Sequence, residues 1–183
     1  LRAVEPSLLL YGEPWAGGPS GLCHTRMFTA GRQRSTGIGM FNDSFRNAIK
    51  GDNDGSRPGY ATGAAGCERE IAKGVVASTH YSDGLSGFAS EPGECVNYVS
   101  CHDNQTLWDK IARSNAFDSI GDRISMDLLA QAIVLTSQGI PFLEGGAELL
   151  RTKRGNHNSY RAGDRVNQFE WRRKHEFREV FDY

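Results

Sequence analysis

The sequence predicts an α/β fold with a parallel sheet, because short apolar runs alternate with helical patterns along its 183 residues. The length and flanks of these runs are typical of strands buried on both faces, as in parallel sheets. Strands that alternate with helices indicate βαβ units. The four expected strands are Leu8–Tyr11, Ile38–Phe41, Val96–Val99 and Ile140–Glu144.

Two helices are expected between these strands. In Glu68–Val76, helical spacing puts Ile71, Val75 and Val76 on one side. The pattern over Gly121–Ser137 is clearer. Its apolar residues at helical spacing are Ile124, Leu128, Leu129, Ala132 and Leu135, and Gly139 is expected at the C-cap position.

Long polar, Gly-rich segments follow the first two strands, over residues 12–34 and 42–66. A (β/α)₈ barrel builds its site from the loops that follow its strands. A complete barrel needs about 250 residues. The sequence therefore predicts a partial (β/α)₈ TIM barrel. Since the chain starts at Leu1 and both ends look cut, residues 1–183 are expected to be one incomplete catalytic barrel domain without its N-terminal half.

The composition excludes several classes of protein. Hydrophobic residues make up 38%, charged residues 23%, and the net charge is −1. No run is long enough to span a membrane, and no basic surface indicates nucleic acid. The cysteines, none in a C-x-x-C pair that would suggest zinc, are expected to be buried or half-buried free thiols. This weakly favours a reducing, cytoplasmic location and otherwise leaves the compartment open. They are Cys23, Cys67, Cys95 and Cys101.

The first candidate for chemistry is Glu13, which directly follows the first strand and precedes Trp15. A carboxylate at the end of a buried strand is partly desolvated, which favours its protonated form and suits a general acid. Trp15 could stack on a sugar ring. The alternative is a polar turn that merely ends the strand.

A second group follows the third strand, where His102, Asp103 and Asn104 are consecutive. A histidine beside a carboxylate can hydrogen-bond sugar hydroxyls and stabilise positive charge at an anomeric carbon. The alternative is structural, with Asp103 or Asn104 capping a helix over residues 106–112. Polar residues also follow the second strand (42–46) and the fourth (Glu144, 156–160 and Asp164), and these suit either a carbohydrate or an ordinary polar loop.

Several stretches in combination resemble type I pullulanases, debranching members of the α-amylase superfamily (glycoside hydrolase family 13). They are LYGEPW (10–15), FNDSFRNAIKG (41–51), VNYVSCHDNQTLWDKI (96–111), LTSQGIPFLEGGAELLRTK (135–153) and HNSY (157–160). The resemblance implies that the chain is the second half of a (β/α)₈ barrel, approximately strands five to eight.

The resemblance also implies roles for individual residues. Glu13 would be the general acid/base, and Asp103 would stabilise the transition state. His102 and Trp15 would contact the substrate. Asn158, Ser159 and Tyr160 would belong to the loop that shapes the glucan-binding subsites.

The activity implied is retaining hydrolysis of α-1,6 branch linkages in pullulan, amylopectin or glycogen-type glucans. The family's nucleophilic Asp, in a GFRFD-type stretch, has no counterpart here and would lie upstream of Leu1. The chain alone is therefore expected to be inactive without its partner, the missing half of the barrel. No cofactor is required, no metal site is predicted, and no D-x-D-x-D-G loop indicates structural calcium.

Other functions stay open from the sequence. One is another superfamily enzyme, such as an isoamylase, a branching enzyme or an α-amylase. Another is a non-catalytic glucan-binding relative. A doubly wound nucleotide enzyme is disfavoured because the chain has no glycine-rich phosphate fingerprint.

Overall fold

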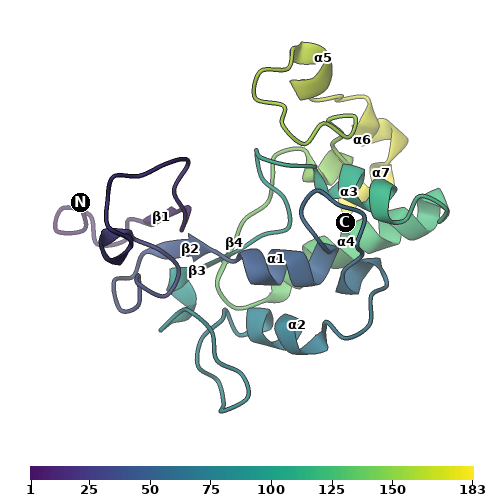
Figure 1. Ribbon diagram of the computed structural model, residues 1–183. Coiled ribbons are helices and arrows are strands. Elements are labelled where there is room, and N and C mark those ends of the chain that lie inside the picture. The colour runs from purple at the N-terminus through teal and green to yellow at the C-terminus, as the bar shows by residue number, and fades with distance from the viewer.

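The computed structural model describes residues 1–183 and contains one parallel four-stranded sheet flanked by helices (Figure 1). The strand order is β1-β2-β3-β4, so each strand pairs with its neighbour in sequence. A doubly wound sheet reverses its strand order at a switch point, whereas this sheet does not. The order is consistent with part of a barrel. The strands are β1 (Tyr11–Gly12), β2 (Gly39–Phe41), β3 (Cys95–Asn97) and β4 (Ile140–Pro141).

All four expected strands are present, but each is shorter than its apolar run, and only the central two are buried. In β3 every residue is buried, and Met40 of β2 is 2% exposed. The expectation of burial on both faces is wrong for β1, where Tyr11 is 49% exposed. The reason is position, because β1 and β4 form the two edges of the sheet.

The helices cover the sheet on one side and extend beyond it toward the C-terminus (Figure 1). Four 3₁₀ turns lie at His24–Arg26, Tyr60–Thr62, Pro92–Glu94 and Ala147–Leu149. None of the helices is both long and apolar enough to cross a membrane. The helices are α1 (Asp43–Lys50), α2 (Glu68–Val75), α3 (Leu107–Ser114), α4 (Ile120–Thr136), α5 (Asp164–Asn167), α6 (Arg173–Glu176) and α7 (Arg178–Asp182).

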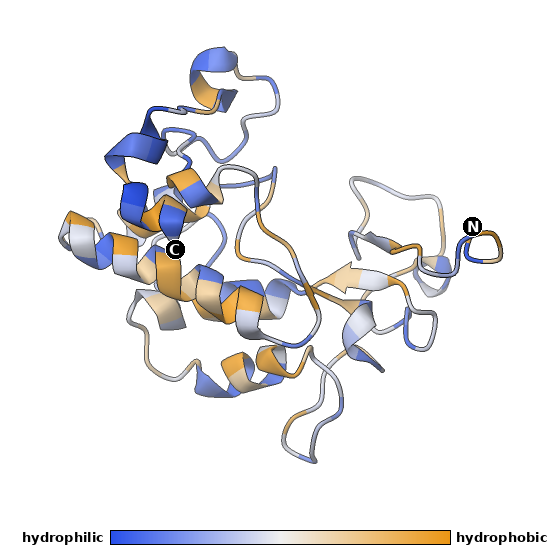
Figure 2. Cartoon of the chain, turned by 180° about the vertical axis from the view of Figure 1, so that it is seen from behind, coloured by the Kyte–Doolittle hydropathy of each residue, from blue (hydrophilic) through white to orange (hydrophobic).

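The main hydrophobic core lies between α1, α3 and α4. Figure 2 shows hydrophobic residues alternating with hydrophilic ones in the helical part of the chain. Phe45, Ile111 and Val134 are each no more than 1% exposed. Two smaller clusters flank it, one beside the sheet around Ala77 and one under the C-terminal helices around Phe177.

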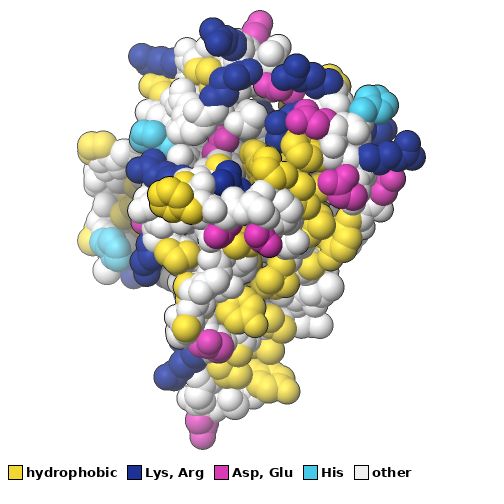
Figure 3. All heavy atoms as spheres, turned by 90° about the vertical axis from the view of Figure 1, so that its right-hand side faces the viewer, with side chains coloured by type: hydrophobic (Ala, Val, Ile, Leu, Met, Phe, Trp, Pro, Cys, Tyr) yellow, Lys and Arg dark blue, Asp and Glu magenta, His cyan; other side chains and the backbone are white.

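Helix α4 confirms the second expected helix, and Ile124 and Leu128 pack inward, but the rest of its buried face differs from the expected apolar set. Leu129 and Leu135 are 45% and 51% exposed, whereas the polar Asp127 and Gln131 are buried. Gln131 Nε2 donates a hydrogen bond to Asp127 Oδ1 one turn away, which pairs one polar atom of each side chain inside. Figure 3 shows the hydrophobic side chains that remain on the outer face of the helical layer.

The expected C-cap of α4 is also wrong. The cap is Ser137 in an extended conformation, and Gly139 lies two residues further on with φ +109°. A Cβ at Gly139 would lie 2.9 Å from the carbonyl oxygen of Cys95, so the glycine lets the chain approach β3 closely.

The cysteines only partly match expectation. Cys95 is buried, and burial raises the pKa of its thiol to about 12. Cys67 and Cys101 are half-buried, but Cys23 is exposed, because it lies in the open loop that follows β1.

Candidate active site

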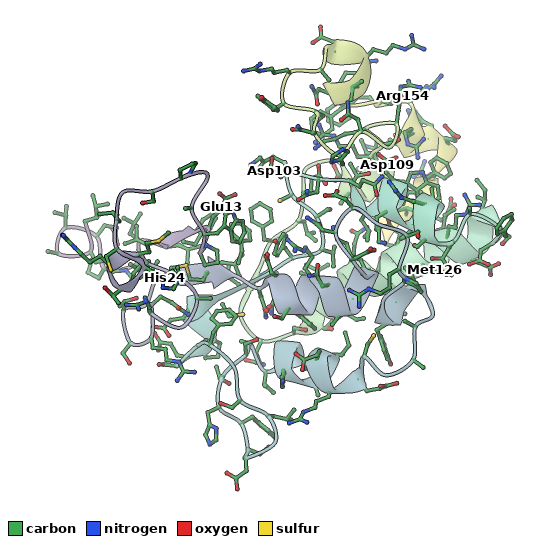
Figure 4. All side chains as sticks on the ribbon, in the orientation of Figure 1. Glu13, His24, Asp103, Asp109, Met126 and Arg154 are labelled. Atoms are coloured by element: carbon green, nitrogen blue, oxygen red, sulfur yellow. The ribbon has the colours of Figure 1, made fainter.

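The structure brings together the two carboxylates that the sequence placed after different strands. Glu13 directly follows β1, and Asp103 lies in the turn after β3. Because the strands are parallel, their carboxyl ends meet at one edge of the sheet. One ligand-type atom each from Glu13, His102 and Asp103 lies within 4.8 Å of the others. Figure 4 shows Glu13 and Asp103 on neighbouring loops.

All three side chains are open to solvent. The His102 and Asp103 side chains are 76% and 63% exposed, and His102 Nε2 lies 3.6 Å from Asp103 Oδ2. Two carboxylates and an imidazole could bind a divalent cation. Exposed acidic groups are common without an ion, so we assign no metal here. The group is well suited to hydrogen-bonding several hydroxyls of one sugar ring.

The expectation that Glu13 is partly desolvated is wrong for this chain, where Glu13 is exposed. The cause is again the edge position of β1, whose C-terminal end leads into an open loop. Trp15 lies two residues further along the same loop and is 42% exposed.

The structural alternative for the turn after β3 is wrong. Neither Asp103 nor Asn104 caps α3. The cap is Thr106, whose hydroxyl accepts a hydrogen bond from the backbone N–H of Asp109 at 3.2 Å. Asp103 therefore does not cap the helix. Asn104 instead adopts the left-handed conformation, with φ 65°.

The loop after β4 places the three expected subsite residues differently from one another. Asn158 is exposed and Tyr160 is 72% exposed, but Ser159 is only 7% exposed. The backbone oxygen of Ser159 accepts a hydrogen bond from Asn167 Nδ2 at 2.9 Å, which links two parts of the same loop region. The loop comes near the loop after α1 through His157, whose Nδ1 lies 4.0 Å from Asp54 Oδ2.

Buried charged groups lie beneath the site. Glu144, which follows β4, is 7% exposed, and its Oε1 lies 3.4 Å from Arg151 Nη1 and 3.7 Å from Lys153 Nζ. Burial raises the pKa of Glu144, while the nearby Lys153 opposes that shift. Lys50 at the end of α1 is 1% exposed, and burial lowers the pKa of its ammonium to about 7.

Two residues near the site were missed by the sequence analysis. Asp54 accepts a hydrogen bond from Asn104, and Lys153 donates one to the backbone oxygen of His102. In sequence each is 50 or 51 residues from its partner. Asp54 was part of a segment interpreted only as a polar loop, and Lys153 carried no signal beyond its charge.

Comparison with known proteins identifies relatives along the whole chain. No protein-family model matches it. The pullulanase of Bacillus subtilis strain 168 is 36% identical over 98% of the chain. A solved pullulanase from Bacillus acidopullulyticus is 52% identical, with a TM-score of 0.94 over 100% of the chain.

The chain is similar to pullulanases along its whole length. A pullulanase from Paenibacillus barengoltzii, solved in complex with maltohexaose and α-cyclodextrin, is also similar, with 41% identity and a TM-score of 0.93 over 100% of the chain. The chain spans about a quarter of the length of these pullulanases: 25%, 22% and 28%, respectively. The similarity to these solved pullulanases agrees with the resemblance to type I pullulanases that the five sequence stretches indicated.

Proposed function

We propose that the chain is part of a retaining glycoside hydrolase that cleaves α-1,6 branch linkages in pullulan, amylopectin or glycogen-type glucans. The observation that carries the proposal is the meeting of Glu13, His102 and Asp103 within 4.8 Å at the carboxyl end of the sheet. Pullulanases similar along the whole chain support the same activity. The complex of a similar pullulanase with maltohexaose and α-cyclodextrin supports an α-glucan as the ligand.

In this proposal Glu13 is the general acid/base, which protonates the oxygen of the leaving sugar and later activates water. Asp103 hydrogen-bonds sugar hydroxyls, and these bonds strengthen as the ring approaches an oxocarbenium ion. His102 binds the same sugar, and Trp15 offers an aromatic face. Asn158 and Tyr160 contact the glucan from the loop after β4, whereas the buried Ser159 contributes through the loop's shape.

The nucleophile completes the proposal. A retaining mechanism needs a second carboxylate about 5–5.5 Å from the acid/base. We assign Asp103 to sugar binding, and we place the nucleophile in a part of the protein outside this chain, on a barrel strand preceding β1. In the complete (β/α)₈ barrel, β1 to β4 would then be strands five to eight, and residues 1–183 are inactive alone.

The decisive experiment is Glu13→Gln in the full-length protein. Glutamine keeps the shape of the side chain but cannot deliver a proton, so reducing-end release from pullulan should fall by about 10²–10⁴-fold. A substrate with an activated leaving group should be less affected, because it needs less protonation. The matched control is Glu68→Gln, since Glu68 is exposed on α2, away from the site.

The outcomes separate the alternatives. Near-normal pullulan cleavage by Glu13→Gln would remove Glu13 from its role. Cleavage of linear amylose by the unmodified protein, without maltotriose release from pullulan, would point to another superfamily enzyme. Glucan binding without any cleavage would point to a non-catalytic relative.

A further inference from the structure

The turn that carries Asp103 is not held by packing. The side chains of His102 and Asp103 are 76% and 63% exposed, so neighbouring side chains cannot fix their orientation. The next residue, Asn104, adopts a left-handed backbone conformation with φ 65°. Asparagine tolerates this region better than most residues, but the conformation is still uncommon and needs support from its surroundings. Something else must fix the turn.

One support reaches the turn from the loop after β4. The side chain of Lys153 is 3% exposed, and its Nζ donates a hydrogen bond to the backbone oxygen of His102 at 2.7 Å. Lys153 is itself fixed, since its backbone N–H donates to Asp109 Oδ2 at 2.7 Å, and Asp109 is buried on α3. A buried ammonium, on a loop that is tied to helix α3, therefore determines the position of the carbonyl that precedes Asp103.

The second support reaches the turn from the loop after α1. Asp54 Oδ2 accepts a hydrogen bond from Asn104 Nδ2 at 2.7 Å. The side chain of Asp54 is 36% exposed, and its Oδ2 also lies 4.0 Å from His157 Nδ1. This charge-assisted hydrogen bond fixes the side chain of Asn104, and so favours the left-handed backbone that follows Asp103.

We propose that Lys153 and Asp54 are positioning residues that fix the turn His102–Asn104 from both sides and so aim the Asp103 carboxylate at the sugar beside Glu13. The inference rests on the proposed function. Asp103 is the single residue between the two fixed points, so the two hydrogen bonds restrict the rotation of its backbone. In many enzymes a displacement of about 1 Å costs about 10²-fold in rate.

The test compares Asp54→Ala with Asp54→Asn in the full-length protein. Both remove the charge, but only asparagine keeps an acceptor for Asn104 Nδ2. We expect Asp54→Ala to lower kcat on pullulan by about 10–100-fold with KM changed by less than about threefold. Asp54→Asn should stay within about threefold of the unmodified enzyme. The control is Asp83→Ala, because Asp83 is exposed in a loop remote from the turn.

Lys153→Met tests the other side, with Lys174→Met as control at an exposed lysine. Arg151 Nη1 lies 3.4 Å from Glu144 Oε1 in the unmodified protein and is not changed in this variant, so we expect the buried carboxylate to keep one partner. We expect a fall in kcat comparable with that of Asp54→Ala. If Lys153→Met does not fold, the comparison of Asp54→Ala with Asp54→Asn alone decides whether the proposal holds. Unchanged kcat in Asp54→Ala, or an equal loss in Asp54→Asn, would overturn the proposal.

Failure of the proposed function would be seen separately, as the absence of pullulan cleavage by the unmodified protein. In that case crystal structures of the unmodified protein and of Asp54→Ala decide on the positioning role. A change in the backbone of Asn104, with the Asp103 carboxylate displaced from Glu13, supports it. A turn that is superimposable in the two structures overturns it.

Discussion

Replacing Asp127 with asparagine should stabilise the protein above neutral pH, because the native carboxyl is buried at an energetic cost. Asp127 lies on α4 and is 1% exposed. Its only side-chain hydrogen-bond partner is Gln131, which donates to Oδ1 from one turn further along the helix. Burial raises the pKa of Asp127 from 3.8 to about 7, and the hydrogen bond from Gln131 offsets part of that shift. Asparagine has the same shape, can keep the bond and carries no charge.

The direction of the pH dependence follows from proton binding. Between pH 3.8 and about pH 7 the folded state holds the Asp127 proton and the unfolded state has lost it. The unfolded state then binds fewer protons, so stability falls as pH rises through this window and levels off above it. The whole window corresponds to about 4 kcal/mol, and the part between pH 5 and pH 8 to about 2–3 kcal/mol.

Thermal unfolding of the full-length protein and of Asp127→Asn, each measured from pH 5 to pH 8, tests this reasoning. We expect the variant to have the higher melting temperature at pH 8, with the difference shrinking toward pH 5. Asp122→Asn is the matched control, because Asp122 is exposed in the first turn of the same helix. A variant less stable than the unmodified protein at pH 8, or a difference that does not change with pH, would refute the buried-charge argument.

Two further predictions concern catalysis and packing. Asp103→Asn should lower kcat strongly, because hydrogen bonds to the sugar strengthen in the transition state, and His102→Ala should lower kcat less. Measurements of kcat and KM on pullulan test this prediction. Small and equal effects of the two substitutions would argue against the proposed roles. Gly74→Ala should destabilise the protein, since the new Cβ would lie 1.9 Å from a ring carbon of Phe45. The overpacking, about 1–3 kcal/mol, outweighs the helix-propensity gain of about 1 kcal/mol. Gly121→Ala on α4, where the nearest atom is 3.8 Å away, should be neutral or stabilising, and melting temperatures of the two variants decide.

The sequence predicted the strands because a buried parallel strand leaves a local mark, a short apolar run between polar loops. It did not predict α1, whose first residues Asp43 and Ser44 resemble a loop and whose cap, Asn42, looked like a site residue. Asn42 is 1% exposed, and its side chain accepts a hydrogen bond from the backbone N–H of Phe45. A polar residue after a strand can serve a helix or a ligand, and only the folded contacts distinguish the two.

The same ambiguity affected the turn after β3, with the opposite result. Capping was expected from Asp103 or Asn104, yet Thr106 caps α3 and leaves Asp103 available. The carboxylates Glu13 and Asp103 were found from sequence because each follows its own strand closely. Their supports, Lys153 and Asp54, were not, because a hydrogen bond between residues about 50 apart leaves no pattern at either position.

The exposure of Glu13 shows that a residue proposed as a general acid needs more than its place at the end of a strand. Desolvation favours the protonated form that a general acid requires, and the edge strand β1 does not provide it. Under the proposed function the desolvation has two sources. One is a strand of the complete barrel that pairs with the free edge of β1, and the other is the bound glucan, which displaces water from the Glu13, His102 and Asp103 side chains. The Asp103 turn needs its two supports, Lys153 and Asp54, for the same reason, because a site that is covered only when occupied must be held in place before the substrate arrives.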